Sequence, residues 1–230
     1  MTQPVLAELD IVDDPDAWRS TGFGADADGR CQVGGTLVRL GHDRGCDRPG
    51  IVGWSLAGLS TRPGGEIDGL PTRVSSLGDA VESAADVPDV HENGVVQIDH
   101  VVVITPDLDR TTEALERVGV VARRTREVPV RPGEPGRVQR FFRLGEVILE
   151  LIGPAEPAGD GPATFWGLAY TVADLDATVR RLGGAVGRAR DAVQPGRRIA
   201  SLRHGVLAVP TAFMSPDPGH GPDSGPAGGR

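Results

Sequence analysis

The sequence predicts an α+β fold made of repeated βαβββ modules. Residues 97–105 (QIDHVVVIT) are apolar and rich in β-branched side chains, which is typical of a buried strand. An amphipathic helix and three further strand-like runs follow. The same order of elements then recurs at an offset of 67 residues, measured between the DLD triplets at 107–109 and 174–176. A fixed offset with matching elements indicates an internal repeat.

The first module is expected over 96–156. Pro106 ends the opening strand, and Asp107 is suited to cap a helix that runs to Gly119. Gly145 suits a tight turn between two strands. The three strands that complete this module are expected at 120–128, 138–144 and 146–152.

The second module is expected over 163–214. Residues 167–176 (GLAYTVADLD) overlay 100–109 (HVVVITPDLD), with the same strand and the same opening of a helix. That helix should end near Leu182, and a hairpin turning at Gly205 should complete the module. Residues 96–214 are therefore predicted to contain a pair of modules.

The N-terminal part predicts a third, degenerate module over 1–62, with a strand, a short helix and two apolar strands. Residues 63–95 mix Gly, Pro, Ser and acidic residues and are expected to be a linker with a short helix around 77–84. Residues 215–230 contain almost nothing that can be buried and are expected to be disordered.

The composition argues against several classes of partner. The net charge is −8, which disfavours a nucleic-acid partner, and all 24 cationic side chains are Arg. Without Lys, no lysine Schiff base can form. The sequence has no signal-peptide pattern and no apolar run of about 20 residues, so we expect a cytoplasmic protein with no membrane partner.

Three segments resemble the vicinal oxygen chelate superfamily, the glyoxalase-, bleomycin-resistance- and extradiol-dioxygenase-like proteins. They are IDHVVV with the DLD that follows, the hairpin RLGEVILELIGP, and GLAYTVADLD. The resemblance implies that two paired modules curl into an open, curved-sheet cup. It also implies a divalent metal in that cup, held by one residue from the first strand and one from the last strand of each module.

Carried over residue by residue, the resemblance assigns His100 and Glu150 as metal ligands or catalytic groups of the first module. The second module has Gly167 at the first position and Pro210 or Thr211 at the other. An imidazole and a carboxylate suit Zn, Ni, Mn or Fe, but catalytic sites normally need three protein ligands. Either one divalent metal binds or no cofactor does, and the second alternative is favoured.

Both residues also have a purely structural interpretation. A single His near the start of a strand is commonly a hydrogen-bonded core or rim residue. Glu150 lies within an apolar strand, where a carboxylate needs a partner. The candidate partners on neighbouring strands are Arg143, Arg198 and Arg203.

Five side chains are candidates for binding a ligand in the cup. Phe141, Trp166 and Tyr170 could line an apolar pocket, although aromatic residues on strands commonly belong to the core. Arg143 and Arg198 could hold a carboxylate or a phosphate, although arginines on edge strands also prevent edge-to-edge pairing.

Two functions remain open at this point. In the first, the cup binds a small metabolite without demonstrated catalysis. In the second, the protein is a metal-dependent lyase, isomerase or dioxygenase that uses Glu150 as base and His100 as acid or metal ligand. Because cups need pairs of modules, the odd third module also predicts a possible homodimer.

Overall fold

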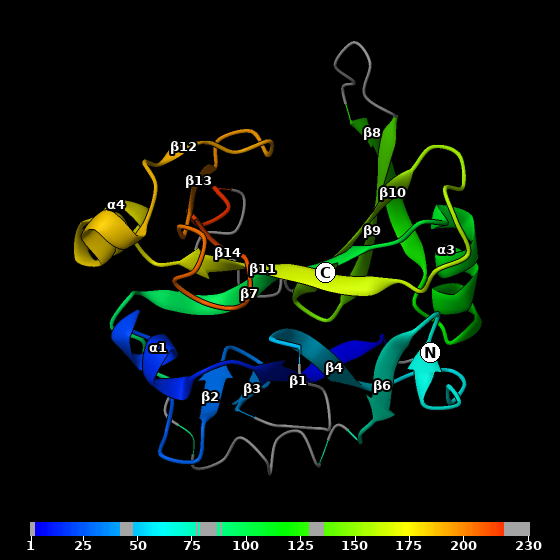
Figure 1. The fold of residues 1–230 in the computed structure, drawn as a ribbon, viewed down its shortest axis with the longest axis horizontal. Coiled ribbons are helices and arrows are strands. Elements are labelled where there is room, and N and C mark those ends of the chain that lie inside the picture. Colours follow the sequence, from blue (N-terminus) through cyan, green and yellow to red (C-terminus); the bar gives the residue numbers. More distant parts are fainter. Residues whose placement is uncertain are drawn as a thin grey trace, which may run out of the picture.

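The computed structural model describes residues 3–41, 48–76, 78, 87, 89–128 and 136–218. These residues form two sheets, which Figure 1 shows one above the other. The upper sheet has eight strands and contains both predicted C-terminal modules. The lower sheet has six strands and contains the N-terminal part. No helix in the described ranges is long and apolar enough to cross a membrane.

The first C-terminal module has the predicted βαβββ order. Its helix begins where the sequence indicates, because the Asp107 carboxylate accepts a hydrogen bond of 3.0 Å from the Arg110 amide. Its elements are β7 (Val95–Ile104), α3 (Leu108–Arg117), β8 (Ala122–Val128), β9 (Arg137–Leu144) and β10 (Val147–Pro154).

The second module repeats this order with shorter strands. Asp174 caps its helix by accepting a hydrogen bond of 3.0 Å from the Ala177 amide. The predicted hairpin is present, but residues 202–210 form a longer loop instead of a tight turn at Gly205. The elements are β11 (Thr164–Val172), α4 (Leu175–Leu182), a 3-10 turn (Gly183–Ala185), β12 (Arg190–Asp191), β13 (Arg198–Ser201) and β14 (Thr211–Met214).

The eight-stranded sheet curls into the predicted cup. Strands β7 and β11 pair antiparallel along its floor, β10 runs parallel to β7, and β14 runs parallel to β11. Strands β8–β10 and β12–β14 rise on the two sides of this floor (Figure 1). The expectation of an α+β fold whose βαβββ modules form a curved-sheet cup is therefore confirmed.

The N-terminal part is a second pair of modules, both truncated. Taken in order across the sheet, its six strands correspond to β9, β10, β7, β11, β14 and β13 of the larger sheet. Each pair of neighbouring strands is parallel or antiparallel as in the corresponding pair of the larger sheet. The first half keeps a helix, whereas the described residues 50–74 of the second half contain none. The elements are β1 (Val5–Val12), α1 (Pro15–Ser20), β2 (Arg30–Val33), β3 (Thr36–Leu40), β4 (Gly50–Ala57), β5 (Glu66–Ile67) and β6 (Leu70–Val74).

This arrangement corrects the predicted division at 62. Strands β5 and β6 lie within the expected linker 63–95 but belong to the N-terminal sheet. Strand β5 has only two residues, and Pro71 lies within β6, so neither gives a clear strand signal in the sequence. The N-terminal strands also complete their own pair, so the odd-module argument for a homodimer does not hold. The helix expected around 77–84 falls largely outside the described residues, as does the tail from 219 on.

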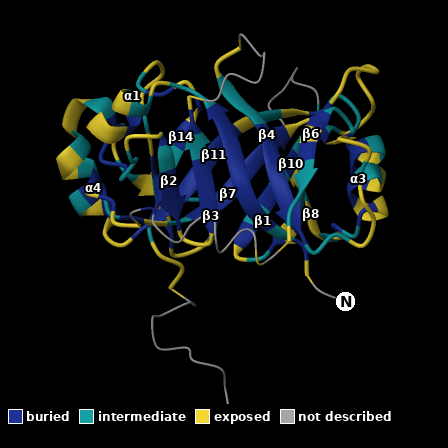
Figure 2. Cartoon of the chain, turned by 90° about the horizontal axis from the view of Figure 1, so that it is seen from below, coloured by how far each residue is buried: buried dark blue, intermediate teal, exposed yellow. Residues whose placement is uncertain are grey.

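The two sheets pack back to back through one apolar core. The Trp54 and Phe165 rings meet at 5.0 Å between centroids, and so do the Phe23 and Tyr170 rings. Figure 2 shows the central strands of both sheets as buried and the outer faces of α3 and α4 as largely exposed. The N-terminal sheet thus covers the convex side of the cup and leaves its concave side open.

The face of the N-terminal sheet that points away from this core is occupied by ion pairs. Glu8 and Asp10 are buried there, and Arg39 lies 2.7 Å from Glu8. Arg73 contacts Glu8 at 3.0 Å and Asp10 at 2.7 Å. Carboxylates therefore neutralise Arg39 and Arg73 on this face.

Candidate functional site

A β-bulge sets the position of His100. Along the pairing of β7 with β11, His100 is aligned with Ala169 and Ile98 with Tyr170, so Asp99 is an extra residue in β7. Neighbouring side chains of a regular strand point to opposite faces, but here Asp99 Oδ1 and His100 Nδ1 lie 2.5 Å apart. Both side chains are buried. The bulge brings an acid and an imidazole together.

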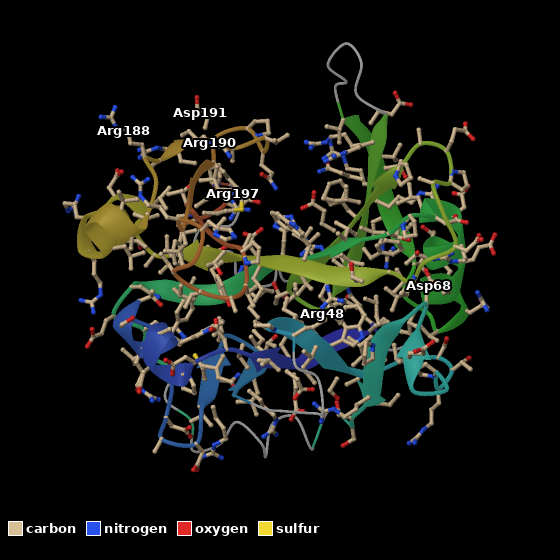
Figure 3. All side chains as sticks on the ribbon, viewed as in Figure 1. Arg48, Asp68, Arg188, Arg190, Asp191 and Arg197 are labelled. Carbon is tan, nitrogen blue, oxygen red and sulfur yellow. The ribbon has the colours of Figure 1, made fainter. Side chains whose placement is uncertain are left out.

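The second oxygen of Asp99 is held from the other half of the cup. Oδ2 accepts a hydrogen bond of 2.5 Å from the Thr171 hydroxyl and another from the buried Arg197 guanidinium. Figure 3 shows Arg197 on the cup side of the floor, beside β13. Burial alone would raise the pKa of Asp99, but the contacts with His100 and Arg197 hold this pKa below its ordinary value.

This network determines which nitrogen of His100 is free. The contact of 2.5 Å between Nδ1 and Oδ1 occupies that nitrogen, although it is not aligned as a hydrogen bond. Nε2 is then the nitrogen left for a hydrogen bond with a ligand.

Glu150 lies on the same concave face as His100. Residues Val102 and Glu150 are aligned across β7 and β10, two positions beyond the pairing of His100 with Ile148. Gln139 donates a hydrogen bond of 2.6 Å to Glu150 Oε1. Burial raises the pKa of Glu150, and the nearby His100, Arg126 and Gln139 oppose this only in part.

The arginine partners expected for Glu150 are engaged elsewhere. Arg198 contacts Asp176 on α4 at 2.9 Å, and Arg203 donates to the Gly184 carbonyl at 2.7 Å. Arg143 donates to the Glu146 carbonyl at 3.3 Å. The side chain that contacts Glu150 directly is the amide of Gln139, so the expectation of an arginine partner is wrong.

The second half of the cup supplies neither matching donor. Across the pairing of β7 with β11, Gly167 is aligned with Val102, and Ala169 is aligned with His100. These two alignments are equivalent when the two modules are exchanged, so Gly167 is the counterpart of His100. The register of β14 makes Ala212 the counterpart of Glu150, and this corrects the expected Pro210 or Thr211. A Cβ atom at Gly167 would lie 2.6 Å from the Pro210 carbonyl oxygen, so no side chain fits there without a shift of the backbone.

The donors present do not form a complete metal site. Within the described ranges, no three His, Cys, Asp or Glu side chains lie close enough together to hold an ion. One nitrogen of His100 is taken by Asp99. The pair His100 and Glu150 falls short of the three protein ligands that catalytic metals normally need.

A cavity of about 520 Å³ lies over the first half of the cup. The structure brings three of the predicted site residues, His100, Phe141 and Arg143, together in its wall. Residues 193–195 of the second module contribute another part of the wall. The remaining lining residues are Arg123, Arg124, Arg126, Phe142 and Ile148.

Three other predicted ligand-binding residues lie elsewhere. Tyr170 follows the cup-facing Ala169, so it points into the core between the sheets and is fully buried. Arg198 is on the outer face of β13, where it pairs with α4. Trp166 is 52% exposed and lines a separate cavity of about 600 Å³ with residues of the 202–210 loop.

Sequence reasoning missed the residues that surround His100 and Phe141. Asp99 and Arg197 are sequence neighbours of two candidates, His100 and Arg198, but neither segment alone indicates that the side chains of Asp99 and Arg197 meet. The arginines at 123, 124 and 126 were visible as a basic run, but strand alternation places adjacent residues on opposite faces. Only the pairing of the strands shows which side chains share a face.

Comparison with known proteins supports the fold. Residues 99–200 match the model of the glyoxalase/bleomycin resistance protein/dioxygenase superfamily. A variant of 4-hydroxymandelate synthase from Streptomyces coelicolor is similar with a TM-score of 0.63 at 13% identity, over 96% of this chain and 94% of that chain. At these identities the likeness concerns the fold alone.

Two further solved structures are similar. One is a xylose isomerase-like TIM barrel/4-hydroxyphenylpyruvate dioxygenase fusion protein, with a TM-score of 0.60 at 11% identity, over 96% of this chain and 50% of that chain. The other is methylmalonyl-CoA epimerase from Mycobacterium tuberculosis, with a TM-score of 0.42 at 21% identity, over 56% of this chain and 94% of that chain. The comparison with curated proteins gave no match.

Proposed function

Because this chain has the vicinal oxygen chelate fold, we propose that it binds a small anionic organic metabolite in the cavity over the first half of its C-terminal cup. The observation that carries this proposal is the wall that joins Phe141 and Ile148 to His100 and Arg143. Its volume of about 520 Å³ lies within the range usual for small-molecule sites, roughly 300–1,000 Å³.

Each part of the wall supports a particular feature of the ligand. Phe141 and Ile148 offer apolar surface to a hydrocarbon or aromatic group. Arg143 is exposed at the cavity and offers a guanidinium to a carboxylate or similar anion. His100 Nε2 adds a hydrogen-bonding group whose orientation is set by Asp99.

We propose that binding does not depend on a metal. Gly167 and Ala212 carry no ligand atoms, and the Pro210 carbonyl excludes a side chain at 167. A metal-dependent lyase, isomerase or dioxygenase would have to operate with His100 and Glu150 alone. The residues at the other two positions give that alternative no support.

The proposal can be tested with 8-anilinonaphthalene-1-sulfonate, a fluorescent probe with an apolar body and one negative charge. We expect saturable binding with one probe per chain. Phe141→Ala and Arg143→Gln should each weaken it by about tenfold. A hydrogen bond to a charged group contributes roughly 1.5–3 kcal/mol, and an aromatic pair contributes about 0.5–1.5 kcal/mol beyond the area it buries.

Trp166→Ala is the matched control, because Trp166 lines a different cavity. Its probe affinity should equal that of the wild type, and circular dichroism should show that every variant is folded. Prior treatment with a chelator should leave the affinity unchanged. Equal affinities for wild type and Phe141→Ala would refute the site, and loss of binding after chelation would favour the metal-dependent alternative.

A further inference from the structure

Strand β8 carries a second bulge, which concentrates arginines in the same cavity. Along its pairing with β9, Ala122 is aligned with Phe142 and Arg124 with Phe141, so Arg123 is the extra residue. Arg126 lies two positions beyond Arg124 and therefore shares its face. All three arginines line the cavity that contains His100.

The ion pairing of these arginines differs from that of Arg140, which lies on the opposite face of the same wall. Arg140 points outward, where it contacts Asp109 on α3 at 2.6 Å and Thr112 at 2.8 Å. The guanidinium groups of Arg123 and Arg124 have no hydrogen-bond or ion-pair partner in the described part of the chain.

Arg126 is only partly satisfied. One of its terminal nitrogens donates to Gln139, but its Nε is buried and has no partner within the described residues. A buried donor of a charged group normally has an acceptor, so this site is suited to an acceptor that the described side chains do not provide.

Protection of the sheet edge would not by itself place three arginines in the wall of the cavity. β8 is an edge strand, and charges on an edge prevent pairing with other chains. That role is fulfilled by charges on either face. Here the bulge turns an additional arginine toward the cavity, in a chain whose net charge is −8. The result is a local positive potential on an acidic protein, which attracts anions.

We infer that Arg123, Arg124 and Arg126 form a phosphate-binding subsite, and that the ligand is therefore an organic phosphate with a second anionic or polar group near Arg143 and His100. This inference rests on the proposed function and names its ligand class. The planar guanidinium matches phosphate in a two-pronged geometry, and three such groups exceed the need of one carboxylate.

The subsite can be tested by calorimetric titration with inorganic phosphate at constant ionic strength, with acetate and sulfate as comparison anions. We expect phosphate to bind once per chain and more tightly than acetate or sulfate. The double variant Arg123→Gln/Arg124→Gln should weaken phosphate binding by at least tenfold. Both side chains are exposed, so the variant should fold normally.

The control is Arg188→Gln, which removes one positive charge, half of the change in the double variant, from an exposed arginine. Figure 3 shows Arg188 near α4, at the far end of the molecule from β8. This variant should bind phosphate like the wild type. An equal loss in Arg188→Gln and in the double variant would overturn the subsite, because it would indicate a general charge effect. So would an absence of phosphate binding.

The two proposals fail in different ways. Saturable binding of the sulfonate probe, with its loss in Phe141→Ala, together with no binding of phosphate, would overturn the phosphate subsite and leave the proposed function standing. Phosphate binding without any saturable probe binding would overturn the apolar site instead. Failure of both titrations would overturn both proposals.

Discussion

Replacing Asp99 with Asn would leave the Arg197 guanidinium buried without an opposite charge. Both side chains are less than one-tenth exposed, at 6% and 7%. Asn retains an oxygen that can accept from Thr171, and its shape is nearly that of Asp. The substitution thus isolates the effect of charge from the effect of volume.

The expected cost follows from the burial of this pair. Removing one partner of a buried ion pair destabilises proteins by about 3–5 kcal/mol, because the remaining charge is left desolvated. Since Asn keeps one hydrogen bond, we expect a loss of about 3 kcal/mol in the free energy of unfolding. Removing both charges in Asp99→Asn/Arg197→Met should cost less than the sum of the two single substitutions, by about 1–3 kcal/mol.

Urea unfolding of the wild type, the two single variants and the double variant at pH 7 measures these differences. The reasoning would be refuted by a loss under about 1 kcal/mol in Asp99→Asn. Strict additivity of the two single losses would refute it as well, because it would show that the charges do not interact.

The same pair predicts the direction of the pH dependence. The pKa of Asp99 is lowered in the folded protein, so its contribution to stability is complete above the unfolded value of roughly 3.9. It is lost as the pH falls toward the lowered folded value. The stability difference between wild type and Asp99→Asn should therefore be largest near pH 7 and shrink below about pH 4.

Three further outcomes are expected. Gly167→His should not create a metal site but should destabilise the fold by about 1–3 kcal/mol, because its Cβ would meet the Pro210 carbonyl; calorimetry with Zn²⁺ and urea unfolding measure both effects. Glu150→Gln should match or exceed the wild type in stability at pH 8 and lose that advantage below about pH 4, because burial raises the pKa of Glu150; unfolding curves at the two pH values show the sign. Tyr170→Phe should raise thermal stability slightly and leave the affinity for the sulfonate probe unchanged, because the buried hydroxyl has no partner among the described residues; a fall in affinity would contradict the assignment of Tyr170 to the core.

The sequence by itself determined the features that depend on short-range patterns. Helix caps at Asp107 and Asp174 are local, and so are the strands that begin each module, which is why the βαβββ repeat could be predicted. The family resemblance, carried over residue by residue, assigned His100 and Glu150 to one site. The likeness between the two halves identified Gly167 as the counterpart of His100.

Only the tertiary structure decided what surrounds that pair. A bulge exists only relative to the strand beside it, so neither the contact of Asp99 with His100 nor the shared face of Arg123 and Arg124 follows from their own segments. The ion pair of Asp99 with Arg197 joins residues far apart in the chain. The obstruction of Gly167 by Pro210 likewise depends on how two strands meet. Local patterns specify elements and faces, whereas the site is completed by contacts between strands, which the linear sequence does not encode in any one place.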